Sequence, residues 1–339
     1  MTENFKNTAQ RVLIALTAVV CLLGCQDRRA ADDQGKTSAC WIYAMLTCIE
    51  HEAGMRGDSV KLSRQWLLSK ELEEQAASLY LMKEHGGTTA LYGARGISSR
   101  GVGPEAIRLA ERYGFVPYQN EKTEITKSSV TERKLWLLTQ QARSLGELRS
   151  RMEKILPRFT ISRNPATESR RQSLDGTEGG HFYYLSMRYN PHQFAESLMY
   201  CQRWEFFASV PYHPYGKPFV LEIPDNYNRH EYINLPPDEL TSRVMESLKA
   251  GHAVYWEYGH KTVDGGHTSD HAVAIVGFTK SRKQPGKVLL KCKNSYGSKW
   301  GRGGYMYVSL EDFRNTTCNV GVITPHPSPA SGSRTPSAY

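Results

Sequence analysis

The chain has 339 residues, of which 40% are hydrophobic and 10% aromatic, so it can bury the core of an ordinary globular fold. Its formal net charge is +9, from 43 basic and 34 acidic residues, and no arginine-rich helix or aromatic-interleaved basic stripe stands out. This pattern predicts a mildly basic, solvated surface and argues against a nucleic-acid partner.

The N-terminal segment has the pattern of a signal peptide. Lys6 and Arg11 precede an apolar stretch, residues 12–24, that is too short to span a bilayer. The stretch ends in Leu-Leu-Gly followed by Cys25, which resembles a bacterial lipobox. We therefore expect residues 1–24 to be removed and Cys25 to carry lipid, which anchors stably when more than one acyl chain is attached. The alternative is an ordinary secretory signal with a chance cysteine.

Residues 25–33 would then form a short tether to the membrane. Gln26, rather than an aspartate, follows the predicted lipid site, so nothing indicates retention at the inner membrane. We expect an address at the bacterial cell envelope, with the outer membrane favoured. The tether leaves no room for an inhibitory propeptide.

Cys40 begins a run with helical periodicity, in which the residues at 42, 45, 46 and 49 form one apolar stripe. A cysteine in the first helical turn lies among unpaired backbone N–H groups, which favour its thiolate form. Gln34 lies one short loop earlier, where its side-chain amide can donate to an oxyanion beside the sulfur.

Two further helices are expected before residue 118. Residues 62–82 have a long amphipathic pattern, and Pro104 marks the start of a helix that runs from Gly103 to Tyr113. Residues 128–156 form a charged helical stretch, and an aromatic-rich stretch follows it. Residues 240–249 predict another helix, which ends at Gly251.

The last third of the chain is rich in predicted strands, over residues 253–258, 270–278, 287–293 and 305–310. His271 lies at the start of the second strand, and Asn294 follows the third. A histidine base with an asparagine that orients its ring is what a thiol nucleophile needs. The tail, residues 324–339, is rich in proline and serine and predicts disorder.

Together these segments resemble the papain-like cysteine peptidases. The matching residues are Gln34, Cys40, Trp41, Asp270, His271, Ala272, Val273, Gly277, Asn294, Ser295, Gly297, Trp300, Gly301, Gly304 and Tyr305. Within that group the chain looks most like the bleomycin hydrolase and bacterial aminopeptidase C branch, through residues 62–65, 100–106, 113–118, 214–217 and 234–239. The resemblance spans roughly residues 34–323.

The resemblance implies an α+β, papain-like fold. A helical N-terminal half that carries the nucleophile helix would pack against a β-rich C-terminal half. Residues 119–230 would be an inserted segment between them. The branch also forms ring-shaped oligomers, so a homo-oligomer is an open expectation.

The resemblance also implies a thiol peptidase that acts on peptides or proteins and needs no cofactor. Cys40 would be the nucleophile, His271 the base, Asn294 the residue that orients it, and Gln34 the oxyanion donor. The positions expected to contact substrate are Gly101, Gly103 and Asp270.

Two positions depart from the family pattern. Thr37 stands where compact family members have a half-cystine, so a disulfide that braces the nucleophile loop is absent. Tyr296 stands where a tryptophan usually shields the hydrogen bond between asparagine and histidine. Neither departure removes a catalytic group.

Several alternatives remain open from the sequence. A non-enzymatic lipoprotein that holds peptides in the same cleft is the second functional class. Cleavage at chain ends and cleavage within chains are both compatible with the residues, as are free or paired states of Cys48, Cys201, Cys292 and Cys318. A zinc site among the histidines and aspartates of residues 260–271 is not expected, because the glycines and threonines among them indicate a loop rather than a ligand-bearing helix.

Overall fold

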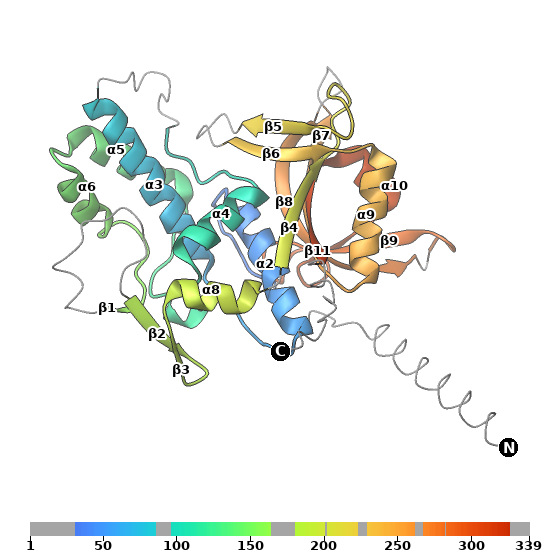
Figure 1. The fold of residues 1–339 in the computed structure, drawn as a ribbon, viewed down its shortest axis with the longest axis horizontal. Coiled ribbons are helices and arrows are strands. Elements are labelled where there is room, and N and C mark those ends of the chain that lie inside the picture. Colours follow the sequence, from blue (N-terminus) through green and yellow to red (C-terminus); the bar gives the residue numbers. More distant parts are fainter. Residues whose placement is uncertain are drawn as a thin grey trace, which may run out of the picture.

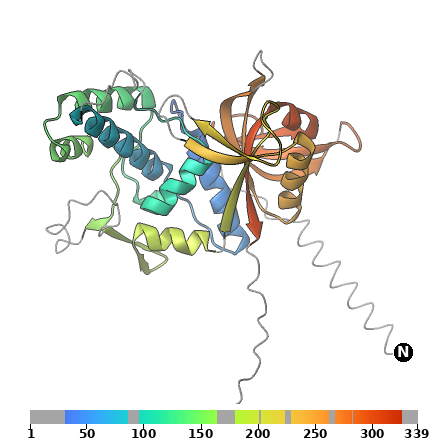
Figure 2. The same ribbon diagram turned by 45° about the horizontal axis from the view of Figure 1, so that its top comes forward.

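A computed structural model describes residues 31–85, 96–163, 180–200, 202–222, 229–261, 267–281 and 283–325. In the views of Figures 1 and 2 these residues form two halves side by side, one of helices and one built around a sheet. Helix α2 (Cys40–Met55) runs between the halves. The predicted signal peptide, Cys25 and most of the tail lie outside the described residues.

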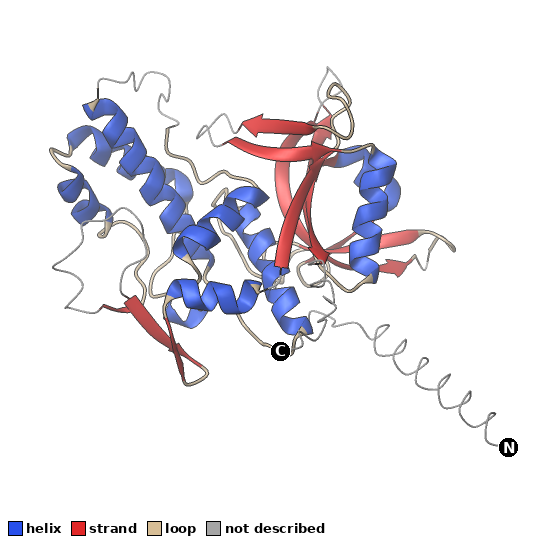
Figure 3. Cartoon of the chain, in the orientation of Figure 1, coloured by secondary structure: helices blue, strands red, loops and turns tan. Residues whose placement is uncertain are grey.

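The helical half comes from the first two hundred residues, coloured blue to green-yellow in Figure 1, and Figure 3 shows its helices gathered apart from the large sheet. Besides α2 it contains α3 (Arg64–Glu84), α4 (Gly103–Tyr113), the 3-10 turn η3 (Tyr118–Asn120), α5 (Ser128–Gln141), α6 (Leu145–Met152) and α8 (Pro191–Met199), with a small sheet of β1 (Ser162–Arg163), β2 (Gly180–Tyr184) and β3 (Met187–Tyr189). Local sequence explains two helix starts. Ser63 caps α3 by accepting from the N–H of Trp66, and Pro104 occupies the first turn of α4.

The other half is an eight-stranded sheet in the order β10-β9-β8-β7-β11-β4-β6-β5. Its strands are β4 (Gln202–Ala208), β5 (Pro218–Glu222), β6 (Arg229–Asn234), β7 (Val254–Lys261), β8 (His267–Lys280), β9 (Val288–Lys293), β10 (Tyr305–Ser309) and β11 (Thr317–Pro325), and helices α9 (Pro237–Lys249) and α10 (Leu310–Thr316) accompany them. The pairs are antiparallel except for β4 and β6. The last strand therefore lies in the middle of the sheet, between β7 and β4.

Both faces of the sheet are covered, and alternate residues of the central strands serve different cores. On β8, Ala272 and Ala274 belong to the core shared with the helical half, whereas Val273 and Ile275 belong to the core under α9 and α10. The small side chains of the two alanines let α2 approach the sheet closely. This approach brings Cys40 to the strand that carries His271.

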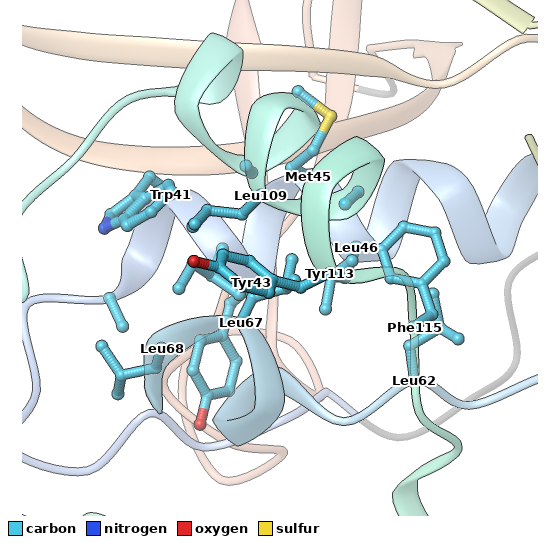
Figure 4. Close-up of a cluster of buried hydrophobic side chains, with 14 of the residues drawn as sticks. Trp41, Tyr43, Met45, Leu46, Leu62, Leu67, Leu68, Leu109, Tyr113 and Phe115 are labelled. Atoms are coloured by element: carbon cyan, nitrogen blue, oxygen red, sulfur yellow. The ribbon is translucent and has the colours of Figure 1, made fainter. Parts of the chain in front are cut away.

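The core of the helical half joins α2, α3 and α4 (Figure 4). Its labelled side chains are Trp41, Tyr43, Met45, Leu46, Leu62, Leu67, Leu68, Leu109, Tyr113 and Phe115. Ion pairs add to this packing, since the buried Arg64 contacts both Glu50 and Asp32. Among the described residues, none of the helices is both long and apolar enough to cross a membrane.

Candidate active site

Cys40 is the first residue of α2, as its sequence pattern predicts. Its sulfur accepts a hydrogen bond from the backbone N–H of Ala272, the residue that follows His271 on β8. The backbone N–H groups of Cys40 and Trp41 also point to the sulfur. The fold thus places the thiol of one half beside the histidine strand of the other.

His271 and Asn294 meet as the sequence pattern predicts. The Nε2 atom of His271 lies 2.7 Å from Oδ1 of Asn294, and both side chains are buried. The same Oδ1 accepts the backbone N–H of Ser295 at 2.7 Å. Because a backbone N–H can only donate, this atom is the amide oxygen, and His271 must donate to it through a protonated Nε2. The Nδ1 atom of the neutral ring is then the free base.

Tyr296 covers the imidazole in the place where a tryptophan was expected. Its ring stacks on His271 with centroids 4.6 Å apart and an interplanar angle of 22°. Trp300 packs edge-on against Tyr296 at 5.6 Å. The Tyr296 hydroxyl lies 3.3 Å from Nδ1 of His271. The side chain therefore both shields the ring and contacts its basic nitrogen.

Gln34 is buried and tied to the asparagine loop. Its backbone N–H donates to the carbonyl of Ser295 at 2.8 Å, and the Ser295 hydroxyl donates to its Oε1 atom. Its Nε2 atom donates to the carbonyl of Thr37 at 2.7 Å, which leaves a second amide hydrogen for another acceptor. Thr37 in turn donates its hydroxyl to the Gln34 carbonyl at 2.7 Å. Hydrogen bonds thus brace the loop that lacks the family disulfide.

Burial opposes ionisation of both reacting groups. Burial raises the pKa of the Cys40 thiol to about 11, and the negative charge of Glu257 adds to this, although hydrogen bonds to the sulfur work against it. Burial also lowers the pKa of His271, against the contribution of Asn294. The expectation that the helix start favours a thiolate therefore does not hold for the isolated thiol, because desolvation outweighs the backbone donors.

Glu257 is a buried carboxylate on β7 that no sequence motif marks. It accepts hydrogen bonds from the N–H of Gly103 at 3.3 Å, from Nδ2 of Asn319 at 2.8 Å and from the hydroxyl of Tyr255. A charged residue inside an apolar strand pattern, residues 253–258, was the available signal.

The predicted substrate-contact positions differ in their surroundings. Gly101 packs so closely on Trp41 that an added Cβ would lie 2.5 Å from two ring atoms. Gly103 is the first residue of α4 and donates its N–H to Glu257. Asp270 precedes the histidine and is exposed. Their contact with substrate stays a prediction.

The described cysteines Cys40, Cys48, Cys292 and Cys318 are free thiols, and Cys201 lies outside the described residues. One carboxylate group could hold a cation by its spacing, formed by Glu71, Glu74 and Glu105. Arg108 contacts all three of its members and Arg112 also pairs with Glu74, so cationic side chains of the chain already lie against this group.

Comparison with known proteins agrees with this geometry. The family model described as papain family cysteine protease matches residues 239–325, the segment that contains His271 and Asn294. The crystal structure of PepW from Lactobacillus rhamnosis HN001 superposes with a TM-score of 0.58 and 18% identity, over 87% of this chain and 80% of that one. The fold is papain-like.

Two further matches cover less of this chain or superpose less closely. Cathepsin J of Mus musculus is 25% identical over 150 residues, which are 40% of this chain and 44% of that protein. The papain-like chain thus spans less than half the length of this curated relative. Xylellain, a cysteine protease from Xylella fastidiosa, is 14% identical with a TM-score of 0.41, over 89% of this chain and 84% of that one.

Proposed function

We propose that the chain is a cysteine peptidase that hydrolyses peptide bonds through Cys40, His271, Asn294 and Gln34. One observation carries the proposal: the Cys40 sulfur is hydrogen-bonded to the backbone next to His271, whose far nitrogen is held by Asn294 at 2.7 Å. A nucleophile, a base and a group that orients the base are thereby assembled from segments that lie far apart in the sequence.

The reaction would begin when Nδ1 of His271 takes the thiol proton of Cys40. The sulfur attacks the scissile carbonyl, and the oxyanion accepts the Cys40 N–H and the second amide hydrogen of Gln34. The imidazolium gives its proton to the departing amine, which leaves an acyl-enzyme. Water then loses a proton to Nδ1 and releases the second product, which regenerates the thiol.

Covalent labelling tests the nucleophile. We expect an epoxide inhibitor that traps active-site thiols to add once per chain, and both labelling and hydrolysis of a mixed peptide library to vanish in Cys40→Ala. Cys318→Ala is the matched control, because Cys318 has a half-buried thiol like that of Cys40 but lies on β11 rather than at the start of α2. A wild-type chain that binds peptides but neither labels nor cleaves them would be the silent peptide-binding lipoprotein instead.

The cleavage mode follows from a second assay. The tail from residue 326 onward does not match the family sequence that restricts the related branch to chain ends, so the mode is best read from substrates. Peptides with free and with acetylated N-termini should be compared in the wild type and in a chain that ends at residue 325. If truncation abolishes a preference for free N-termini, the enzyme is an aminopeptidase whose tail restricts cleavage to chain ends. If both chains cleave both peptides equally, the enzyme is an endopeptidase.

We further propose that Cys25 anchors the enzyme by lipid at the bacterial cell envelope, with the outer membrane favoured. The supporting feature is the apolar stretch of residues 12–24 ending at that cysteine. Cys25→Ser should move the protein from the membrane fraction to the soluble fraction and remove the lipid mass from its N-terminal peptide. Cys21→Ser, within the apolar stretch, is the control that should change neither.

A further inference from the structure

The hydroxyl of Tyr296, which touches the proposed base, indicates how the resting site is held. Tyr296 lies flat on His271, with its hydroxyl 3.3 Å from Nδ1. That nitrogen is the atom that must accept the thiol proton in the proposed reaction. A tryptophan in the same place would carry no hydroxyl.

The direction of this hydrogen bond follows from the other side of the ring. Asn294 presents an oxygen to Nε2, so Nε2 carries the ring proton and the neutral Nδ1 has only a lone pair. The Tyr296 hydroxyl therefore donates to Nδ1. The lone pair that should receive the proton of Cys40 is already occupied by another donor.

We propose that the Tyr296 hydroxyl is a brake on the base: it donates to Nδ1 of His271 in the resting site and must rotate away before Nδ1 can take the thiol proton. The inference rests on the proposed function and deepens it. In the step itself the S–H bond of Cys40 breaks and an N–H bond forms at Nδ1. The tyrosine keeps its own proton throughout and turns toward water, to which its half-exposed side chain has access.

The surroundings favour this resting state. Tyr258 from β7 lies 5.8 Å from His271 between ring centroids, and Tyr296 stacks on the imidazole at 4.6 Å. Cys40 from α2 is hydrogen-bonded to Ala272, the residue after His271, and acts electrostatically on Tyr296. Asp270 is the exposed neighbour of His271 on β8, and Glu257 acts on the Cys40 sulfur. Burial lowers the pKa of His271 and raises the pKa of Tyr296, so the neutral imidazole and the protonated phenol are the favoured forms of this pair. A hydrogen bond to the neutral ring lowers its pKa further.

The test uses the full chain and removes only the hydroxyl. Tyr296→Phe keeps the stacked ring, and Tyr296→Trp supplies the residue that the family pattern expects. Both should raise the rate of Cys40 alkylation by iodoacetamide between pH 5.5 and 7, by about 2-fold to 10-fold, which is the range for loss of one neutral hydrogen bond. Tyr307→Phe, a partly exposed tyrosine on β10, is the matched control and should alkylate like the wild type.

A second readout does not depend on catalysis. In a Cys40→Ala background, the pKa of His271 from imidazole NMR should rise by about 0.3 to 1 pH unit when Tyr296→Phe is added. An unchanged His271 pKa, or alkylation that falls in Tyr296→Phe, would overturn the brake while leaving peptidase activity in place. Failure of the proposed function looks different: alkylation of Cys40 in the wild type would be the same in His271→Ala, with no peptide cleaved. A wild type that is inert but gains His271-dependent alkylation in Tyr296→Phe would support the brake.

Discussion

At the scale of single residues, Asn294 acts on the reaction only through His271. Its Oδ1 atom holds Nε2 at 2.7 Å, and the imidazolium that forms during catalysis strengthens this bond. Hydrogen bonds to charged groups contribute about 1.5–3 kcal/mol, so Asn294→Ala should lower kcat/KM by roughly 10-fold to 100-fold. Steady-state kinetics on a fluorogenic peptide measures the change.

Asn234 offers a matched control for that substitution. It is another buried asparagine, and its side-chain amide bonds the backbone of Val210 and His213, away from the site. Asn234→Ala should lower the melting temperature yet leave kcat/KM of the folded protein within about 2-fold. Wild-type kcat/KM in Asn294→Ala would show that the stacked Tyr296 alone orients the ring.

Gly101 is a second residue at which one close contact, with Trp41, leaves no room for a side chain. A Cβ at this position would lie 2.5 Å from the buried ring of Trp41, which cannot retreat because its Nε1 donates to the carbonyl of Ser99 at 2.9 Å. Gly101→Ala should cost about 1–3 kcal/mol of unfolding free energy through overpacking, and should lower kcat/KM because Trp41 adjoins Cys40. Chemical denaturation and peptide kinetics measure the two effects.

Gly146 shows what the same change does where space is available. It lies in α6, and the nearest atom to an added Cβ is 3.9 Å away. Gly146→Ala should stabilise the protein by about 0.5–1 kcal/mol through helix propensity and leave kinetics unchanged. If Gly101→Ala were as stable as Gly146→Ala, the close contact with Trp41 would not limit the site.

Residue-scale prediction from sequence succeeded where spacing within a motif carries the chemistry and failed where tertiary burial decides. The pairing of His271 with Asn294 followed from their motifs, although they lie on different segments. The ionisation of Cys40 did not, because desolvation depends on how closely Ala272 and Ala274 admit α2. Nor did the tie between Gln34 and Ser295, which joins positions more than 250 residues apart.

At the scale of elements, α3 and α4 are joined by a buried carboxylate pair. Burial raises the pKa of Glu71 of α3 well above its ordinary value, and the neighbouring Glu105 of α4 adds to this shift. Although burial also acts on Glu105, hydrogen bonds from His230 and Arg108 lower its pKa to about 2. These opposite shifts correspond to a protonated Glu71 beside an ionised Glu105.

The pair predicts opposite effects of two isosteric substitutions. Unfolding releases the proton of Glu71 above pH 4.5, so the contribution of this group to stability is full below pH 4.5 and is lost as the pH rises from there through the raised pKa of the folded state. Glu71→Gln keeps the donor and has no such loss, so its stability relative to the wild type should grow from pH 4.5 to pH 7. Urea denaturation across this range measures the difference. A constant difference would mean that Glu71 is ionised in the folded state.

Glu105→Gln is the control with the other sign. Its depressed pKa means that the carboxylate stabilises the fold above pH 4.5 and that this stability is lost as the pH falls toward 2. The variant should therefore be less stable than the wild type at pH 7, and the gap should close on acidification. A stabilising effect at pH 7 would show that the two carboxyl groups have exchanged roles.

Sequence patterns predicted an element well where local signals mark its two ends. The helix α4 has the predicted bounds, Gly103–Tyr113, because proline begins it and glycine follows it. The strands around His271 and Asn294 were also found, as β8 and β9. The order of the sheet was not predicted, because β11 enters between β7 and β4 through contacts that no local period encodes. In the aromatic stretch at residues 182–187, Phe182 of β2 is buried, whereas Tyr183 of β2, Leu185 of the turn and Met187 of β3 are exposed.

At the scale of the whole molecule, one charge joins the two halves next to the nucleophile. Glu257 of β7 accepts the N–H of Gly103 at the start of α4, and within its own half it is held by Tyr255 and Asn319. The same carboxylate helps to keep the Cys40 thiol protonated. The carboxylate that links the two halves therefore also raises the pKa of the Cys40 thiol between them.

Removing the negative charge of Glu257 should change the pKa of the Cys40 thiol. Glu257→Gln keeps the shape of the side chain but removes its negative charge, so it should lower the pKa of Cys40 from about 11. Thiolate absorbance during an alkaline titration, in a His271→Ala background that removes the base, measures the shift. Glu239→Gln, an exposed acid on α9, is the control and should leave the titration unchanged. If both variants titrate like their parent, burial by the assembled halves is the sole cause of the high thiol pKa, and Glu257 serves only to hold the halves together.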